Sequence, residues 1–356
     1  MNSRKLRIGI IGSGQFAREC HIPCLQSHPN VEIVAICGRS ATKLALQFGI
    51  ESVMDKYEEL CTRNDIDAIT IASANQDHAA HAIAALTGSK HVFCEKPLAL
   101  TVQDANTMTL LAKKTNKVNF VGFTFRYNHG VQDMKKRIGN GEIGKPFLAR
   151  IQYDRWDGLI KNPDRANSGH AQYHKPGMLL NLGSHLFDIL RYVLGPIDTV
   201  IGHTHSIQQT KGEEAKTIVD VNPIDDLAGA WIKHKNGVHA QFFISQVTPS
   251  FAELGFLEII GENGALKAAL SRGSVDSIKL STPWSPEWSE LTLPELSNPN
   301  EPHALKRMMH HYVDACLRNK MNENIDATFE DGRQAQLAMA ALIDSQSSGS
   351  WTKLSL

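Results

Sequence analysis

The sequence predicts an α/β protein with a doubly wound parallel sheet in its N-terminal part and a large, mostly antiparallel open sheet in its C-terminal α/β part. Three observations predict this fold class. Short apolar runs alternate with helical patterns up to about residue 125, which is typical of parallel βαβ units. A glycine-rich turn follows the first apolar run. Beyond about residue 125, successive strand patterns are separated by turn residues, as in antiparallel sheets.

The elements of the N-terminal part follow from their apolar patterns. Strands are expected at short, nearly continuous apolar runs, because a strand covered by helices on both faces of its sheet is buried on both sides. Helices are expected where apolar residues recur every three or four positions. The expected strands are 6–11, 31–37, 66–72, 91–94 and 118–123, and the expected helices are 15–27, 41–48, 77–87 and 101–115.

The C-terminal part has a different rhythm. Residues 146–154 alternate like a half-exposed strand, and a strongly apolar helix is expected at 178–194. One face of the sheet is expected to be covered by helices. The other expected elements are strands at 198–207, 227–234, 238–247, 253–260 and 264–270, a surface loop at 282–301, and helices at 303–319 and 328–345.

The composition excludes several functional classes. The 37 Lys and Arg residues balance 37 Asp and Glu residues, so no net positive charge attracts nucleic acid or an anionic membrane. No apolar run approaches the length of a membrane span. The six cysteines form no CxxC pair and no zinc-type spacing. The chain enters a strand within a few residues, which leaves no room for a signal peptide. We therefore expect a cytoplasmic protein without nucleic-acid or membrane partners.

The strand at 6–11 leads into Gly12-Ser13-Gly14-Gln15-Phe16-Ala17, which fits the pattern G-x-G-x-x-A. Gly12 permits a tight turn, and Gly14 lets the backbone approach a pyrophosphate. The helix that follows supplies N–H donors for the phosphates. An ordinary glycine turn could give the same letters, but its position between a strand and a helix indicates a Rossmann dinucleotide-binding site. The cofactor-binding residues expected here are Gly12, Gly14, Gln15 and Phe16.

The end of the second strand indicates which nicotinamide cofactor binds. NAD-binding sites commonly place Asp or Glu there for the ribose 2′-hydroxyl, whereas this chain reads Cys37-Gly38-Arg39-Ser40. The missing acid removes a repulsion against a 2′-phosphate, with which Arg39 could pair and to which Ser40 could donate a hydrogen bond. We therefore favour NADP. The alternative is that Arg39 lies in solvent and the site binds NAD through other contacts.

Two segments carry candidate catalytic groups. Glu95-Lys96-Pro97 follows the strand at 91–94, at the sheet edge where doubly wound folds bind ligands. A lysine beside the positive nicotinamide ring could orient a hydroxyl or relay a proton. His185 lies in the apolar helix at 178–194, one turn after Asn181 on the same face. A histidine titrates near about pH 6.5, which suits the removal of an alcohol proton, although a buried structural histidine is the alternative.

These motifs, in this order and spacing, resemble the glucose-fructose oxidoreductase/inositol dehydrogenase/rhizopine-catabolism oxidoreductase family, and the resemblance covers nearly the whole chain. Supporting matches are 73–78, 122–127 and 329–332. The resemblance implies a Rossmann NAD(P)-binding domain at 1–125, to which the helix at 328–345 returns, and a substrate-binding and oligomerisation domain at 126–327.

The same resemblance implies the roles of individual residues. Lys96 and His185 are the implied catalytic pair, with His185 as general acid/base and Lys96 orienting the substrate. The residues implied on the nicotinamide side are Ser73, Asn75, His78 and Glu95, and those implied near the substrate are Arg126 and Tyr127. Asn181 departs from the family pattern, in which Asp is frequent. Because Asn carries no proton, we expect it to position the substrate or His185.

A long polar and aromatic segment before the catalytic helix is expected to form a wall over a hydroxyl-rich ligand. Its candidate substrate contacts are Trp156, Tyr173 and His174. No metal site is expected, because the spacing of His170, His174 and Asp157 does not indicate one and the family chemistry needs none.

The sequence therefore predicts an NAD(P)-dependent oxidoreductase that transfers a hydride between the nicotinamide and a hydroxyl or keto carbon of a sugar, sugar derivative or polyol. Two alternatives stay open. One is a redox-assisted glycosidase or lyase that holds NAD tightly, and the other is a non-catalytic protein that senses a sugar or cofactor. A homodimer or homotetramer is expected by analogy with the fold.

Overall fold

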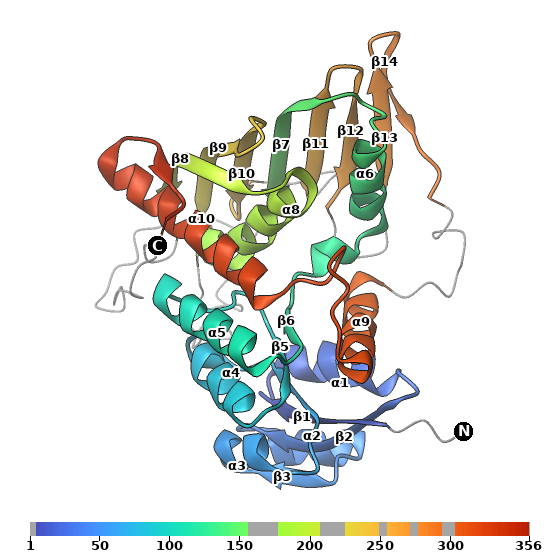
Figure 1. Cartoon of the computed structure of the whole chain (residues 1–356), viewed down its shortest axis with the longest axis vertical. Helices are drawn as coiled ribbons and strands as arrows, with labels where there is room; N and C mark the ends of the chain where they lie inside the picture. Colours follow the sequence, from blue (N-terminus) through green and yellow to red (C-terminus); the bar gives the residue numbers. More distant parts are fainter. Residues whose placement is uncertain are drawn as a thin grey trace. The chain divides into compact units, whose positions relative to one another are not determined.

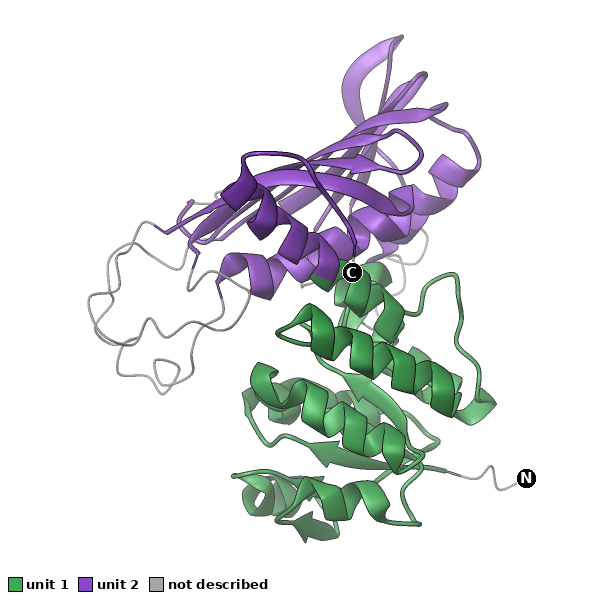
Figure 2. Cartoon of the chain, turned by 60° about the vertical axis from the view of Figure 1, so that its left-hand side comes forward, with its two compact units in different colours: residues 1–127, 302–336 green, residues 128–301, 337–356 purple. Residues whose placement is uncertain are grey.

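The computed structural model describes residues 5–155, 177–206, 225–248, 255–270, 277–293 and 303–355. The chain divides into two compact units, shown in Figure 2. Unit 1 consists of residues 1–127 and 302–336, and unit 2 of residues 128–301 and 337–356. No helix in the described ranges is long and apolar enough to cross a membrane.

Unit 1 is built on a six-stranded parallel sheet with the order β3-β2-β1-β4-β5-β6, which confirms the predicted doubly wound Rossmann arrangement. Its strands are nearly continuous apolar runs because both faces of the sheet are covered. They are β1 (Leu6–Ile11), β2 (Val31–Cys37), β3 (Ser52–Met54), β4 (Ala68–Ile71), β5 (His91–Cys94) and β6 (Asn119–Val121).

The helices of unit 1 include a segment from far along the chain. α9 (Ala304–Arg318) adds Met308, Met309, Tyr312 and Val313 to the core that contains Ile8 and Phe120. The Tyr312 hydroxyl donates to the Ile69 carbonyl at 3.1 Å. The other helices are η1 (Ala17–His21), α1 (Ile22–Gln26), α2 (Ala41–Phe48), α3 (Tyr57–Thr62), η2 (Asn75–Asp77), α4 (His78–Thr87), α5 (Val102–Thr115), η3 (Thr124–Tyr127) and the beginning of α10 (Phe329–Ser348).

Unit 2 is built on a nine-stranded sheet with the order β14-β13-β12-β11-β7-β10-β9-β8-β15. Its described neighbours pair antiparallel except β7 and β10, which are parallel, so the prediction of a mostly antiparallel sheet is confirmed. The strands are β7 (Pro146–Asp154), β8 (Ile197–His205), β9 (Leu227–His234), β10 (His239–Ser245), β11 (Gly255–Gly261), β12 (Gly264–Ala269), β13 (Ile278–Thr282), β14 (Ser285–Glu290) and β15 (Thr352–Lys353).

Helices cover one face of this sheet, as Figure 1 shows. They are α6 (His129–Gly139), η4 (Leu179–Gly183), α8 (Ser184–Leu194) and the end of α10. Phe187 of α8 stacks on Phe242 of β10 with ring centroids 4.6 Å apart. The opposite, outer face of the sheet carries half-exposed aromatic side chains such as Trp231, which is 43% exposed.

The structure corrects some of the expected elements. The loop predicted at 282–301 is wrong for residues 285–290, which form β14. Every residue of β14 is exposed, so it lacks the apolar alternation that reveals a strand with one buried face. Residues 303–327, expected in the second domain, belong to unit 1, because α9 packs on the core beside β1 and β5.

Candidate functional site

The loop after β1 has the geometry of a phosphate-binding turn. Gly12 has a φ of +115°, and a Cβ atom there would collide with the carbonyl group of Ala72. Only glycine fits this position. At Gly14, by contrast, no described atom lies within 4 Å of where a Cβ would be. Because that space is open and Gly14 is exposed, a ligand phosphate can approach the backbone there.

The loop after β2 is attached to this turn. The Ser13 hydroxyl oxygen accepts a hydrogen bond from the Ser40 N–H at 2.8 Å. Gly38, with a φ of +151°, packs so closely that a Cβ would lie 2.6 Å from the Ser13 Oγ. The structure therefore brings Arg39 and Ser40, both exposed, next to the phosphate loop. Gln15 and Phe16 are also exposed at the start of the following helix.

The end of β5 places Glu95 and Lys96 in a well-defined backbone setting. Glu95 is buried, and its Oε2 accepts a hydrogen bond from the Lys96 N–H at 3.2 Å. Its Oε1 lies 2.9 Å from Nε2 of His21, a fully buried residue at the end of η1. Sequence reasoning missed His21. The signal in the sequence was that His21 is a polar residue on a helix turn that faces the sheet. A polar side chain buried there needs a hydrogen-bond partner.

His78 supports the loops after β4 and β5. It is fully buried, with Nδ1 at 2.8 Å from the Pro97 carbonyl oxygen and Nε2 at 3.3 Å from that of Ser73. Burial lowers the pKa of His78, since desolvation disfavours the imidazolium. The Ser73 hydroxyl lies 2.9 Å from Nδ1 of His81, and Asn75 is half-buried at the start of η2. Ser73 and Asn75 thus lie on the loop that His78 braces.

Arg126 and Tyr127, expected near the substrate, are buried in unit 1. Tyr127 is fully buried, and its hydroxyl donates to Asp326 Oδ1 at 2.9 Å. The Arg126 guanidinium forms an ion pair with Asp331 at 3.0 Å. Tyr127 therefore fastens the segment before α10 to η3, and Arg126 fastens the first turn of α10. Direct contact of Arg126 and Tyr127 with substrate stays a prediction.

The helix that carries His185 begins with a π-helical turn, η4, which contains the half-buried Asn181. His185 lies in the first turn of α8 and is 2% exposed. Asp225 anchors the start of η4, because its Oδ2 accepts a hydrogen bond from the Leu179 N–H at 2.8 Å. Burial raises the pKa of Asp225 to about 6. Gly177 is required beside this carboxylate, since a Cβ there would collide with Oδ1.

Some predicted site residues fall outside the described part of the chain. Trp156, Tyr173 and His174 lie in the stretch 156–176, which the structure does not describe. Among the described residues, no group of three or more His, Cys, Asp or Glu side chains is arranged to hold a metal ion.

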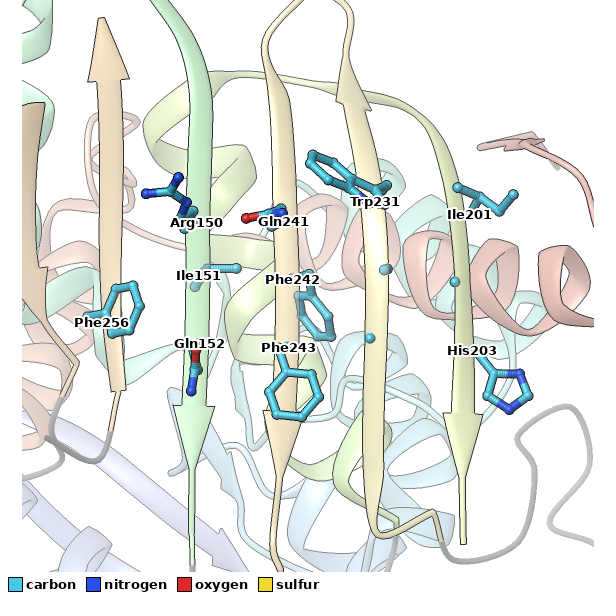
Figure 3. Close-up of a pocket in the computed structure, with 13 residues that line it drawn as sticks. Arg150, Ile151, Gln152, Ile201, His203, Trp231, Gln241, Phe242, Phe243 and Phe256 are labelled. Atoms are coloured by element: carbon cyan, nitrogen blue, oxygen red, sulfur yellow. The ribbon is translucent and has the colours of Figure 1, made fainter. Parts of the chain in front are cut away.

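The outer face of the unit 2 sheet contains a shallow hollow of about 600 Å³, shown in Figure 3. Its lining includes Trp231, Phe243 and Phe256, together with the polar side chains of Arg150 and Gln241. Gly229 lies between Phe243 and His203 in neighbouring strands and leaves part of this surface without a side chain. The hollow faces away from the helices that carry His185.

Comparison with known proteins gives consistent matches over both units. Residues 6–123 match the family described as "Oxidoreductase family, NAD-binding Rossmann fold", and residues 131–267 match "GFO/IDH/MocA C-terminal domain". The 1,5-anhydro-D-fructose reductase of Ensifer adhaerens is 30% identical over 73% of this chain and 74% of its own length. The D-glucoside 3-dehydrogenase of Escherichia coli K12 is 30% identical over 59% of this chain and 60% of its own length.

Solved structures show the same fold. A levoglucosan dehydrogenase in complex with NADH and levoglucosan superposes with a TM-score of 0.84 at 21% identity, covering 99% of this chain and 100% of that one.

Proposed function

The chain belongs to the GFO/IDH/MocA family of NAD-binding oxidoreductases, and on that premise we propose that it transfers a hydride between a nicotinamide cofactor and a hydroxyl or keto carbon of a sugar, sugar derivative or polyol. The observation that carries the proposal is the contrast between the two glycines after β1. Gly12 is closed in by Ala72, whereas Gly14 faces open space, as a turn that receives a pyrophosphate requires. The names of the relatives, a reductase and a dehydrogenase of sugar derivatives, support the substrate class.

The residues present fit a dinucleotide, which when bound supplies the hydride acceptor or donor. Gly14, Gln15 and Phe16 would hold its phosphates. Ser73, Asn75 and Glu95 would lie toward its nicotinamide end, with His78 bracing their loops.

His185 would accept the proton of the substrate hydroxyl at its imidazole or return it during reduction. The Lys96 ammonium would donate a hydrogen bond to that oxygen, and Asn181 would hold a neighbouring hydroxyl or His185. Trp156, Tyr173 and His174 stay candidates for substrate contact.

NADP is the proposed preferred cofactor. The support is the position of Arg39 and Ser40, which are exposed and attached to the phosphate loop through Ser13. An arginine there can pair with a 2′-phosphate through two parallel hydrogen bonds. Residues 37–40, which end β2 and begin the loop after it, include no Asp or Glu to repel that phosphate.

A symmetric assembly is also part of the proposal, with the outer face of the unit 2 sheet as the contact surface between copies. The support is the cluster formed by the exposed Trp231 and the half-buried Phe243 and Phe256 around the hollow of Figure 3. Exposed contiguous apolar surface is characteristic of protein interfaces, and aromatic side chains are enriched in them. A homodimer or homotetramer would bury it.

The test follows the absorbance of reduced nicotinamide across a panel of sugars, sugar phosphates, glycosides and polyols, with NAD and with NADP. We expect turnover with at least one member. Lys96→Met and His185→Gln should each lower kcat by about 10²–10⁴-fold, the range for loss of a positioned acid/base group. The matched controls Lys114→Met and His205→Gln, at exposed positions, should be fully active.

The proposal fails if neither cofactor binds and no panel member changes the absorbance. Cleavage of a glycoside without net change in reduced nicotinamide would also contradict it.

A further inference from the structure

We propose that His21 is a positioning residue for Lys96: it fixes the carboxylate of Glu95, and Glu95 in turn fixes the backbone of Lys96. This inference rests on the proposed role of Lys96 and adds to it a residue that lies on the helix after the phosphate loop. It predicts that one buried contact between η1 and the end of β5 determines how accurately the Lys96 ammonium is aimed.

The π-helical turn η1 puts the His21 ring inside unit 1. The Ile22 N–H donates to the Ala17 carbonyl, which is the i→i+5 bond of such a turn. Phe16 and His21, five residues apart, meet with ring centroids 5.2 Å apart. On its other side the imidazole meets Phe93 of β5 at 5.4 Å. π-helical turns are frequent at functional sites, and here the turn carries both an exposed phosphate-loop residue and a fully buried histidine.

The contact between His21 and Glu95 is specific in its direction. Nε2 of His21 lies 2.9 Å from Oε1 of Glu95. When Glu95 is ionised its carboxylate can only accept hydrogen bonds, and Nε2 of His21 is then the donor. Oε2 of the same carboxylate accepts the Lys96 N–H at 3.2 Å. Each carboxylate oxygen therefore has its own donor.

The missing side chain of Gly122 leaves room for the Glu95 carboxylate in its buried position. A Cβ atom at Gly122 would lie 3.0 Å from both carboxylate oxygens, so the group packs flat against the backbone after β6. Glu95 is 8% exposed, and a buried carboxylate that loses a donor is costly because water does not replace the lost hydrogen bond. Without His21, the least costly response is for Glu95 to turn toward solvent. That movement would release the Lys96 N–H.

The peptide after Lys96 is held in a similar way, because the Pro97 carbonyl oxygen lies 2.8 Å from Nδ1 of the buried His78. Lys96 is thus fixed on its N-terminal side through His21 and Glu95, and on its C-terminal side through His78. A displacement of about 1 Å at a reacting group can cost roughly 100-fold in rate. Loss of the His21 contact should therefore reduce turnover more than it reduces ligand binding.

The experiment compares His21→Gln with His21→Met. The Gln amide reaches the position of Nε2 and can donate to Glu95, whereas Met fills similar volume without a donor. We expect His21→Met to lower kcat by about 10- to 100-fold, with the substrate KM changed by less than about threefold, and His21→Gln to restore most of kcat. His28→Met is the matched control: His28 is also buried and lies two residues after the end of α1, but its ring lies 3.5 Å from Asp314, outside this network. This control should keep kcat.

A second readout uses the protein without cofactor. The rate at which an amine-reactive reagent modifies Lys96, measured by peptide mass spectrometry, should change in His21→Met and stay at the wild-type value in His21→Gln. If His21→Met does not fold, His21→Asn replaces it, because its amide reaches only the Nδ1 position.

The outcomes separate the two proposals. If Lys96→Met keeps full turnover, the role proposed for Lys96 fails. If Lys96→Met is inactive while His21→Met matches the wild type in kcat and in Lys96 modification, only the positioning role fails. Equal loss of kcat in the Met and Gln variants would also overturn it, since that result would reflect packing of the ring rather than the hydrogen bond to Glu95.

Discussion

At the scale of single residues, the turn after β1 uses two glycines for opposite reasons. Gly12 needs to be glycine because of its own backbone, which has a φ of +115° and touches Ala72. A Cβ at Gly14 would touch no described atom, so this position would need to be glycine only because a ligand approaches it. The two requirements can be separated by experiment.

We expect Gly12→Ala to destabilise the protein without cofactor by about 2–4 kcal/mol, through backbone strain and the collision with Ala72. Gly14→Ala should leave that stability within about 0.5 kcal/mol and weaken cofactor binding by at least about tenfold. Thermal unfolding without cofactor and a fluorescence titration with cofactor measure the two effects. Wild-type affinity in Gly14→Ala would show that no phosphate approaches this glycine.

Arg39 gives the second prediction at this scale. Arg39→Ala should weaken NADP binding by about 10- to 100-fold, because a hydrogen bond to a charged group contributes about 1.5–3 kcal/mol, and should leave NAD binding nearly unchanged. Binding of both cofactors is measured by calorimetry. Arg18→Ala, at an exposed residue paired with Glu19, is the control and should affect neither. Equal losses for NAD and NADP would contradict the 2′-phosphate assignment.

The sequence predicted settings that depend on nearby residues and did not predict contacts between distant segments. The environments of Gly12, Arg39 and Lys96 follow from a strand end and the few residues after it. Tyr127 is different: its hydroxyl binds Asp326, about 200 residues later, and no local pattern announces that contact. The same holds for His21, whose partner Glu95 lies on another strand.

At the scale of elements, the expected helices at 15–27 and 178–194 exist, but each contains a π-helical turn, η1 or η4, that the sequence did not predict. A π turn accommodates one extra residue without disturbing the apolar periodicity enough to be visible. Whether it forms depends on packing, for example of His21 against Phe93. The Asn181–His185 spacing was predicted as a regular α-helical turn, whereas Asn181 lies within η4.

Asp225 leads to a prediction about pH, because it holds the start of η4 as a buried carboxylate. Its pKa rises from 3.8 to about 6 on folding. Between pH 3.8 and about 6, Asp225 keeps a proton in the folded protein that it has lost in the unfolded chain. The contribution of Asp225 to the free energy of unfolding is therefore fully present below about pH 4 and is lost as the pH rises through 6. Relative to Asp225→Asn, the wild type should lose roughly 2 kcal/mol of unfolding free energy between pH 4.5 and pH 7.5.

Urea unfolding of both proteins from pH 4.5 to pH 7.5 measures this difference. Asp344→Asn, at an exposed position of α10, is the control and should run parallel to the wild type. A constant difference between wild type and Asp225→Asn at all pH values would rule out the buried, protonating carboxylate.

At the scale of the whole molecule, the strand and helix patterns were sufficient to predict one parallel and one mostly antiparallel sheet, since buried parallel strands and half-exposed antiparallel strands differ in pattern. The patterns did not predict β3, β13, β14, β15 or the parallel pairing of β7 with β10. It was not sufficient to assign α9. An amphipathic helix indicates that one of its faces is buried, but not against which sheet, and the choice of unit 1 depends on how Tyr312 fits between Phe93 and Phe120.

The outer face of the unit 2 sheet provides a prediction about assembly. Trp231→Glu places a charge among Ile201, Gln241 and Phe243 and should reduce the solution mass from that of an oligomer toward that of a monomer, because an unpaired buried charge is costly at an interface. Light scattering after size-exclusion chromatography measures the mass. Trp284→Glu, at a 93% exposed tryptophan in the β13–β14 turn, should leave it unchanged. A wild-type protein that is monomeric at high concentration would refute the interface.

The returning helix α9 also affects how the protein is made. Domains near the start of a chain generally fold while synthesis continues, but unit 1 needs residues that emerge up to residue 336. At about 5–20 residues per second, the ribosome takes about 10 to 40 seconds to add the roughly 200 residues after residue 127. Until then the apolar surface that Met308, Tyr312 and Val313 cover stays open. The strands of unit 1 therefore stay uncovered on this side until α9 has been made, and a nascent chain halted before α9 should bind chaperones through this surface.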